Sequence, residues 1–400
     1  MKKVFAILVA IVLSLSIVAC GETGNEGDND NNSKIENPYY SKSLNLSEKI
    51  FEDFWLPSNR MMAYVPEYIS GDIDSDLSGT AALWSYGAVL TMVGTMAKLD
   101  PEYSLNRERM SMMLKGLEEF RLPRKARVYS ATVGLSEPYY DDNAWVALGM
   151  YDFVEVEGED SECRTIAKDI TDYVLSGESV NGGIFWKESV ASRNTCSSGP
   201  AIVAALKEYK LSEDKKYLEA AKRIYDWTHD TLCDPLDNVY WDNATYDENT
   251  GTEIISKPKF TYNSGTMIWA GTMLYEITGN AEYLEDAKKT AEGSFAYFTM
   301  QNSNGVSYFP ATPWFNLYLL QGYLSLYNID GNNEYVEAFA KNLDIAWENG
   351  RDENGYVMPN WGVGAVLDEY KYVSLLQEAA TAECYALIAG YQIKKGEQQI

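Results

Sequence analysis

Histidine is almost absent from this chain of 400 residues, which contains only His229. The chain therefore lacks the residues for a metal site built from several histidines, and any histidine-dependent triad would have to use this one residue. His229 stands late in a helical pattern and precedes Asp230. We expect it to be a surface or helix-end residue rather than a catalytic one.

Cysteine is also scarce, with five residues and no pair at C-x-x-C spacing. The absence of this spacing argues against a zinc site, and we expect mostly buried free thiols. The acidic run 72–76 begins like a calcium loop, but Leu77 and Leu83 stand where glycine and glutamate are needed. The sequence therefore predicts neither a metal nor an organic cofactor.

Basic residues are few, because 33 lysines and arginines face 59 acidic residues and give a net charge of −26. An acidic surface repels phosphate backbones, which argues against nucleic acid as a partner. A neutral ligand such as a sugar is compatible with this charge, and so is a role in solubility alone.

Long apolar runs are missing after the first twenty residues. Lys2 and Lys3 precede the apolar stretch 4–18, and Ile17–Cys20 has the pattern of a lipobox. A run this short ends in a processing site and does not span a membrane. We expect a signal peptide at 1–20 and a lipid anchor on Cys20, which would place the protein in the cell envelope, on the outer membrane.

The residues after Cys20 divide into a short and a long part. Segment 21–37 is polar and acidic, which predicts a flexible tether and resembles a surface-export signal. Residues 38–400 read as one domain. With 46% hydrophobic and 13% aromatic residues, the chain has enough apolar side chains for a large core.

Helical periodicity dominates that domain, whereas β-alternation is scarce. We expect twelve helices, at about 45–55, 80–97, 105–119, 140–155, 161–176, 195–209, 213–231, 263–277, 281–299, 312–328, 332–349 and 371–394.

A weak repeat shows how these helices pair. The pattern around Tyr217 recurs around Tyr283 and Tyr335, each time after an apolar helix and a polar turn. Six helical hairpins of this kind predict an all-α fold, an (α/α)6 barrel; an open α-solenoid is the alternative. Segments 265–277 and 314–326 have the composition of inner helices, and 217–230 that of an amphipathic outer helix.

Long connections should carry the function, since loops of this length in a compact domain are usually functional. In a barrel of hairpins they would gather around one mouth. They are 121–139, 177–194, 232–262, 300–311 and 350–370.

Two adjacent carboxylates, Asp141 and Asp142, stand at the expected start of a helix beside tyrosines, Asn143 and Trp145. Aspartates at this place are often no more than helix-capping residues. Retaining glycosidases, however, need two carboxyl groups about 5–5.5 Å apart, and neighbouring aspartates reach that separation. The helix N-terminus would favour one ionised carboxylate, whose charge would keep the second protonated as a general acid.

The stretch 140–145 resembles the aspartate-pair motif of glycoside hydrolase family 76, the endo-α-1,6-mannanases. Segments 182–187, 193–195 and 261–265 resemble further motifs of that family, with Ser264 at a place where glutamine is usual. The resemblance implies an (α/α)6 fold and hydrolysis of α-1,6-mannan with retention. It makes Asp141 the nucleophile and Asp142 the acid/base.

Further residues are predicted to bind the sugar. They are the aromatics Tyr140, Trp186 and Tyr262 and the polar residues Asn143, Asn194, Asp242 and Asn263. The expected partners are α-mannan or manno-oligosaccharides and, through Cys20, a membrane; we expect a monomer. Two other functions stay open: a different (α/α)6 glycosidase, such as an unsaturated glucuronyl hydrolase, and a non-catalytic surface glycan-binding lipoprotein.

Overall fold

The computed structural model describes residues 33–66, 79–362 and 373–397. The expected signal peptide, Cys20, most of the expected tether and the acidic run 72–76 lie outside the described residues. None of the helices in the described part combines the length and the apolar character that a membrane span requires.

Twelve long helices make up most of the described chain, and they lie close to their expected ranges except for the first, which begins at 38 and not at 45. They are α1 (Pro38–Asp53), α3 (Leu83–Leu99), α4 (Ser104–Leu117), α5 (Tyr140–Glu157), α6 (Glu162–Leu175), α7 (Thr195–Ser212), α8 (Lys215–Leu232), α9 (Thr261–Thr278), α10 (Ala281–Phe298), α11 (Pro313–Asp330), α12 (Glu334–Asn349) and α13 (Leu375–Glu397). A short 3-10 helix, η2 (Glu118–Phe120), follows α4.

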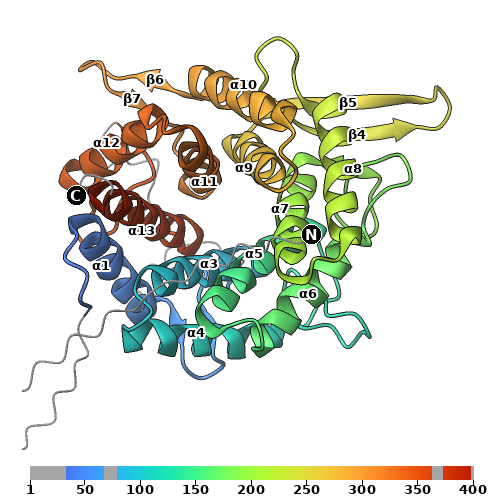
Figure 1. Ribbon diagram of the computed structural model, residues 1–400. Coiled ribbons are helices and arrows are strands. Elements are labelled where there is room, and N and C mark those ends of the chain that lie inside the picture. Colours follow the sequence, from blue (N-terminus) through green and yellow to red (C-terminus); the bar gives the residue numbers. More distant parts are fainter. Residues whose placement is uncertain (1–32, 67–78, 363–372, 398–400) are drawn as a thin grey trace, which may run out of the picture. The chain divides into compact units, whose positions relative to one another are not determined.

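These helices form two concentric rings, as Figure 1 shows. Helices α3, α5, α7, α9, α11 and α13 contact one another in sequence, and α13 returns to α3, so the inner ring is closed. Helices α4, α6, α8, α10 and α12 each pack outside the inner helix that precedes them. The predicted (α/α)6 barrel is therefore confirmed, and an open solenoid is excluded.

The sixth pair joins the two ends of the domain, since α1 packs against α13. The side chain of Asn37 caps α1 by accepting from the backbone N–H groups of Tyr39 and Tyr40. Ser33 donates to Asp100, and Ile35 packs against the core. Among the described residues, contacts with the barrel thus include Ser33 and Ile35, which precede α1.

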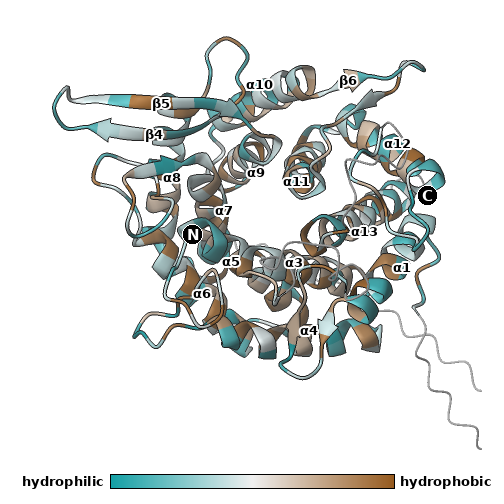
Figure 2. Cartoon of the chain, turned by 180° about the vertical axis from the view of Figure 1, so that it is seen from behind, coloured by the Kyte–Doolittle hydropathy of each residue, from teal (hydrophilic) through white to brown (hydrophobic). Residues whose placement is uncertain are grey.

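Small residues let the inner helices approach closely. A Cβ on Gly265 of α9 would lie 2.3 Å from the carbonyl oxygen of Tyr318, and one on Gly322 of α11 would lie 2.4 Å from the carbonyl oxygen of Gly265. Only glycine fits such backbone contacts. Figure 2 shows hydrophilic stretches on the outer helices, as expected for amphipathic helices that face solvent on one side.

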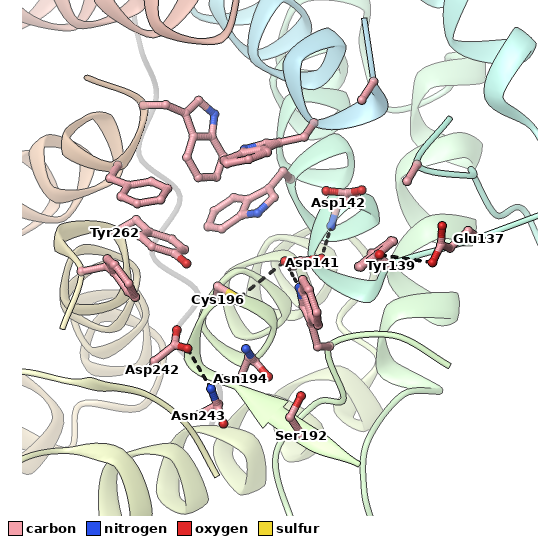
Figure 3. A pocket seen from close by; sticks show the side chains of 18 of the residues that line it. Glu137, Tyr139, Asp141, Asp142, Ser192, Asn194, Cys196, Asp242, Asn243 and Tyr262 are labelled. Atoms are coloured by element: carbon pink, nitrogen blue, oxygen red, sulfur yellow. Dashed lines mark hydrogen bonds between the residues drawn. The ribbon is translucent and has the colours of Figure 1, made fainter. Parts of the chain in front are cut away.

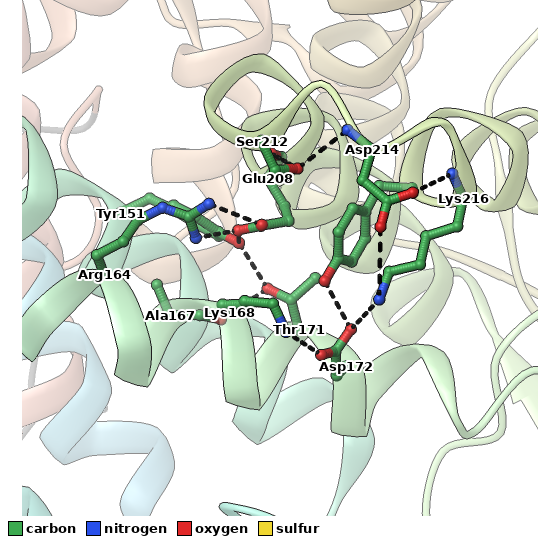
Figure 4. Close-up of polar contacts among 11 residues, drawn as sticks. Tyr151, Arg164, Ala167, Lys168, Thr171, Asp172, Glu208, Ser212, Asp214 and Lys216 are labelled. Atoms are coloured by element: carbon green, nitrogen blue, oxygen red, sulfur yellow. Dashed lines mark hydrogen bonds and ion pairs between the residues drawn. The ribbon is translucent and has the colours of Figure 1, made fainter. Parts of the chain in front are cut away.

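Buried polar side chains link the two rings, and Figure 4 shows one such cluster. Glu208 of α7 is completely buried and pairs with Arg164 of α6, whose Nη2 donates to Oε1 at 2.7 Å. The Tyr151 hydroxyl donates to the same carboxylate at 3.0 Å. Because a buried charge needs such partners, this cluster fixes α5, α6 and α7 against one another.

The described strands are short except for one hairpin that the sequence did not predict. They are β1 (Trp55–Leu56), β2 (Met61–Met62), β3 (Ser192–Asn194), β4 (Trp241–Asp247), β5 (Thr252–Lys259), β6 (Met300–Gln301) and β7 (Ser307–Tyr308). β4 pairs antiparallel with both β3 and β5. The segment expected to be a loop at 232–262 is therefore largely a β-hairpin that projects from the barrel (Figure 1).

His229 lies in the last turn of α8, and its Nδ1 is 3.3 Å from the Asp230 carboxylate. The expectation of a helix-end histidine is confirmed. The four cysteines in the described residues are free, and three of them are buried.

Candidate active site

A cavity of about 630 Å³ opens at the N-terminal ends of the inner helices. This volume is typical of small-molecule sites. Its walls come from those helix ends and from the loops before them. Its lining includes Trp84, Glu137, Tyr139, Asp141, Asp142, Trp145, Trp186, Ser192, Asn194, Cys196, Asp242, Asn243, Phe260, Tyr262, Trp314 and Phe315.

Asp141 and Asp142 occupy the first turn of α5 and both face this cavity. The N-cap residue, Tyr139, makes no side-chain capping bond. Instead, Oδ1 of Asp141 accepts from the backbone N–H of Asp142 at 2.8 Å. Asp141 thus uses one oxygen to satisfy a free N–H of the helix start, where the helix dipole stabilises negative charge.

The other oxygen of Asp141 meets two side-chain donors, drawn in Figure 3. The indole Nε1 of Trp186 donates to Oδ2 at 2.9 Å, and the thiol of Cys196 donates to it at 3.5 Å. A carboxylate that accepts from three donors is held in one orientation, and its ionised form is favoured. Among the described residues, no hydrogen bond to the carboxylate of Asp142 appears.

The two carboxyl groups differ in their electrostatics for this reason. Burial raises the pKa of Asp141 to about 6, while its hydrogen bonds to Asp142, Trp186 and Cys196 act in the opposite direction. Burial and the charge of Asp141 both raise the pKa of Asp142 well above its usual value. The hydrogen bonds therefore favour the charge on Asp141, and that charge favours the proton on Asp142.

Trp186 is placed by a tight loop that packs on an outer helix. Gly182 and Gly183 have φ values of 88° and 72°, and a Cβ on either would lie within 2.2 Å of the Trp227 ring on α8. The loop then runs past the start of α5, where the Trp186 carbonyl accepts from the N–H of Tyr140 at 2.9 Å. Backbone and side chain of Trp186 thus hold the same helix end.

Five aromatic side chains form a continuous wall of the cavity. The rings of Tyr262 and Phe315 stack with centroids 4.3 Å apart. The Trp314 ring meets Trp84 at 5.1 Å and Trp145 at 5.2 Å, both edge to face. Aromatic faces and edges of this kind suit the C–H surfaces of a sugar ring.

The third side of the cavity is polar. Asp242 on β4 accepts from the amide of Asn243 at 2.8 Å, and burial raises its pKa. Asn194, at the end of β3, is 7% exposed, and its Oδ1 has no hydrogen-bond partner in the described part of the chain. A buried acceptor left open in a cavity wall is suited to a ligand hydroxyl.

The predicted sugar-binding residues therefore divide into two groups. Trp186, Asn194, Asp242 and Tyr262 line the cavity. Tyr140, Asn143 and Asn263 are buried and lie outside the lining just described.

Two of these three buried residues have structural surroundings. The Tyr140 ring stacks on Tyr173 at 5.0 Å, because the side chain at the first position of α5 turns toward α6. Asn143 donates to the carbonyls of Tyr129 and Tyr139 and accepts from the N–H of Tyr129, which ties loop 121–139 to α5. Asn263 is completely buried in the first turn of α9, where its side chain lowers the pKa of the cavity residue Asp242 by hydrogen bonding, against the effect of burial.

Trp84, Trp314 and Phe315 were missed as cavity residues. Each stands at the start of an inner helix, and the predicted start of each of these helices was correct to within a few residues. The signal that could have found them is an aromatic side chain in the first turn of a predicted inner helix. Cys196, in the first turn of α7, was also missed, and no comparable signal in the sequence marks it.

Of the five long connections, 121–139, 177–194 and 232–262 reach this cavity. Segments 300–311 and 350–362 do not line the cavity, and they contact each other through the Asn302 amide, which donates to the Gly362 carbonyl. In the part of the chain that the structure describes, no cluster of histidine, cysteine and acidic residues could hold a metal ion.

Comparison with solved structures finds the same fold in bacterial enzymes. The chain is 25% identical to the glycoside hydrolase family 76 mannosidase Bt3792 of Bacteroides thetaiotaomicron. The superposition covers 90% of this chain and 100% of that one, with a TM-score of 0.81. It is also 25% identical to an inactive variant of the α-1,6-mannanase GH76A of Salegentibacter sp. HEL1_6, with two consecutive aspartates replaced, in complex with α-1,6-mannotriose (TM-score 0.72; coverage 88% and 99%).

Sequence comparisons agree. The family model described as glycosyl hydrolase family 76 matches residues 57–311. The meiotically up-regulated gene 191 protein of Schizosaccharomyces pombe is 24% identical over 64% of this chain and 59% of its own length. The mannan endo-1,6-α-mannosidase DCW1 of Candida glabrata is 27% identical over 30% of this chain and 28% of its own length. The alignments thus span less than two thirds of these curated relatives.

Proposed function

Because the chain belongs to glycosyl hydrolase family 76, we propose that it is a retaining endo-α-1,6-mannanase with Asp141 as nucleophile and Asp142 as acid/base. The observation that carries this proposal is the asymmetry of the two carboxyl groups. Asp141 accepts three hydrogen bonds, whereas burial and its neighbour's charge raise the pKa of Asp142. A double displacement needs one ionised and one protonated acid at a single bond.

In the first step the Asp141 carboxylate attacks the anomeric carbon of the mannosyl unit, and the bond from that carbon to the bridging oxygen breaks. Asp142 gives its proton to the leaving oxygen. In the second step water attacks the same carbon, its proton goes to Asp142, and Asp141 leaves. Two inversions restore the original configuration.

The substrate class is supported by the cavity and by the relatives. Aromatic rings on one wall and uncharged or paired polar groups on the other suit a neutral hexose. The Salegentibacter relative is an α-1,6-mannanase, and the inactive variant in complex with α-1,6-mannotriose has two consecutive aspartates replaced. Asp141-Asp142 is the only such dipeptide in this chain.

The sequence left two other functions open. Family membership sets aside an unsaturated glucuronyl hydrolase. A non-catalytic glycan-binding protein would give the opposite result in the assay below, because it would bind mannan and release no product.

The assay digests unbranched α-1,6-mannan with the wild-type chain and with Asp141→Asn and Asp142→Asn. We expect oligosaccharides from the wild type and a loss of more than about a thousandfold in either variant, as for removal of a catalytic group. Asp160→Asn, an exposed carboxylate in the turn after α5, is the matched control. Proton NMR of the first products should show the α-anomer. A β-anomer would refute retention.

We also propose that Cys20 carries the lipid anchor and that the domain is held at the outer membrane. The lipobox at 17–20 and the polar segment after it support this. Mass spectrometry of the N-terminal peptide from membrane fractions should find a diacylated Cys20. The variant Cys20→Ala, which cannot be acylated at this position, should appear in the soluble fraction.

A further inference from the structure

The opposite mouth of the barrel, at the C-terminal ends of the inner helices, also contains cavities. Two of them, of about 400 Å³ and about 520 Å³, share Glu155, Trp269, Ser325 and Asn328 in their walls. Their remaining lining comes from all six inner helices. It includes Lys98, Tyr151, Lys207, Lys210, Gln321, Tyr327, Tyr391 and Lys394. The two cavities therefore form one hollow around Trp269.

Most charges at this mouth are paired, and the Lys394 ammonium donates to the amide oxygen of Asn328. Lys98 donates to Asp152 at 2.8 Å, and Lys207 lies 3.3 Å from Asp152 and 3.1 Å from Glu155. Lys210 lies 3.2 Å from Glu276. Cations at helix C-termini are expected, because they meet the negative end of the helix dipole. The hollow is thus close to neutral in a protein of net charge −26.

The helix dipoles explain the lysines at this mouth but not the uncharged groups around Trp269. Trp269 of α9 is partly exposed, and the Lys207 ammonium lies 5.8 Å from its ring. Gln321, Ser325 and Asn328 of α11 lie on the same wall, and Tyr327 and Tyr391 meet edge to face at 5.0 Å beside them. An indole face flanked by amides, hydroxyls and paired charges offers stacking to a sugar ring and both donors and acceptors to its hydroxyls.

We propose that this hollow is a second glycan-binding site, which holds a neutral segment of the mannan chain on Trp269 while another segment occupies the catalytic cavity. The proposal rests on the proposed function for the identity of the glycan. The charges favour a neutral ligand. Lys98, Lys207 and Lys210 already pair with carboxylates, and the acidic protein would repel an anionic ligand. A ligand held at both mouths gains effective concentration at the catalytic one.

The experiment is an NMR titration of the full chain with α-1,6-mannotetraose, using the Asp141→Asn/Asp142→Asn double variant so that the probe stays intact. The indole N–H signals report the two mouths separately. The Trp269 signal is assigned by its loss in Trp269→Phe, and Trp84 reports the catalytic cavity, where it is 38% exposed.

We expect the Trp269 and Trp84 signals to move with two different dissociation constants. Adding Gln321→Ala should weaken binding at Trp269 by about tenfold, which corresponds to ~1.4 kcal/mol, and leave the Trp84 constant where it was. Tyr297→Ala is the control, because Tyr297 is 53% exposed on outer helix α10 and lines neither mouth. Melting curves of each variant exclude unfolding.

Each outcome separates the two proposals. If the Trp84 signal responds and the Trp269 signal does not, the second site is refuted and the catalytic cavity stands. The same holds if both signals follow one dissociation constant and Trp84→Ala weakens the binding seen at Trp269. If Trp269 responds and the wild-type chain cleaves no mannan, the second site stands as a glycan site and the hydrolase proposal fails.

Discussion

Replacing Trp186 with phenylalanine removes one specific hydrogen bond from the proposed nucleophile. The ring and its edge-to-face contact with Tyr139, with centroids 5.0 Å apart, can persist. The indole N–H that donates to Asp141 Oδ2 at 2.9 Å is lost. That donor stabilises the ionised form of Asp141, so its removal should raise the pKa of Asp141 above the wild-type value of about 6.

The expected size follows from the strength of such a bond. A hydrogen bond to a charged group contributes about 1.5–3 kcal/mol, and Trp186 is 37% exposed, so water replaces part of it. About 1.4 kcal/mol remains, or ~1 pKa unit. Well below that pKa the ionised fraction of Asp141 falls about tenfold. Above it, where Asp141 is ionised in both proteins, the loss should be small.

The assay is the pH profile of kcat/KM for mannan oligosaccharides, from pH 4 to 9. The acid limb of Trp186→Phe should move up by ~1 unit while the alkaline limb, set by Asp142, stays in place. Tyr139→Phe is the control, since it removes a hydroxyl from the same cavity without a contact to Asp141. An acid limb that does not move, or an equal loss at every pH, would refute the assignment of Asp141 as the ionised partner.

Three further changes test the site and the fold. Cys196→Ala should shift the same acid limb upward by less than Trp186→Phe, because a thiol at 3.5 Å is a weak donor, and Cys196→Ser should restore it. Gly265→Ala should lower the free energy of unfolding in urea by about 3 kcal/mol, since its Cβ would meet the α11 backbone, whereas Gly79→Ala, with no atom within 4 Å, should not. Burial raises the pKa of Glu383 to about 7. The folded state thus holds a proton that the unfolded state releases, and stability from this group falls as pH rises from 4.5 to 7. Glu383→Gln should remove that slope in thermal melts.

Most of the fold was readable from periodicity. The inner helices α9 and α11 are apolar and rich in small residues, and the outer helix α8 is amphipathic, so their places in the two rings follow from burial alone. The β4–β5 hairpin was not readable, because its residues alternate little and half of them are charged or exposed. The pairing of α1 with α13 also escaped, since no local pattern shows that the first helix closes the last pair.

The candidate site was predicted in part. The aspartate pair stands out in the sequence because two acids precede an apolar helix beside aromatic residues. Which neighbours face the cavity depends on rotation about the helix axis. Tyr140 and Asn143 are one residue away from the pair yet point into the core, and Trp145 returns to the cavity side. The contact of Cys196 with Asp141 joins two helices and has no local sequence signal.

The most direct test of the account is the covalent intermediate. In Asp142→Ala the second step lacks its base, so an α-mannosyl substrate with a good leaving group should leave a hexose on the enzyme. Mass spectrometry of the digested protein should find that hexose on Asp141. A hexose on another residue, or rapid turnover to the inverted sugar with no adduct, would contradict the assignment.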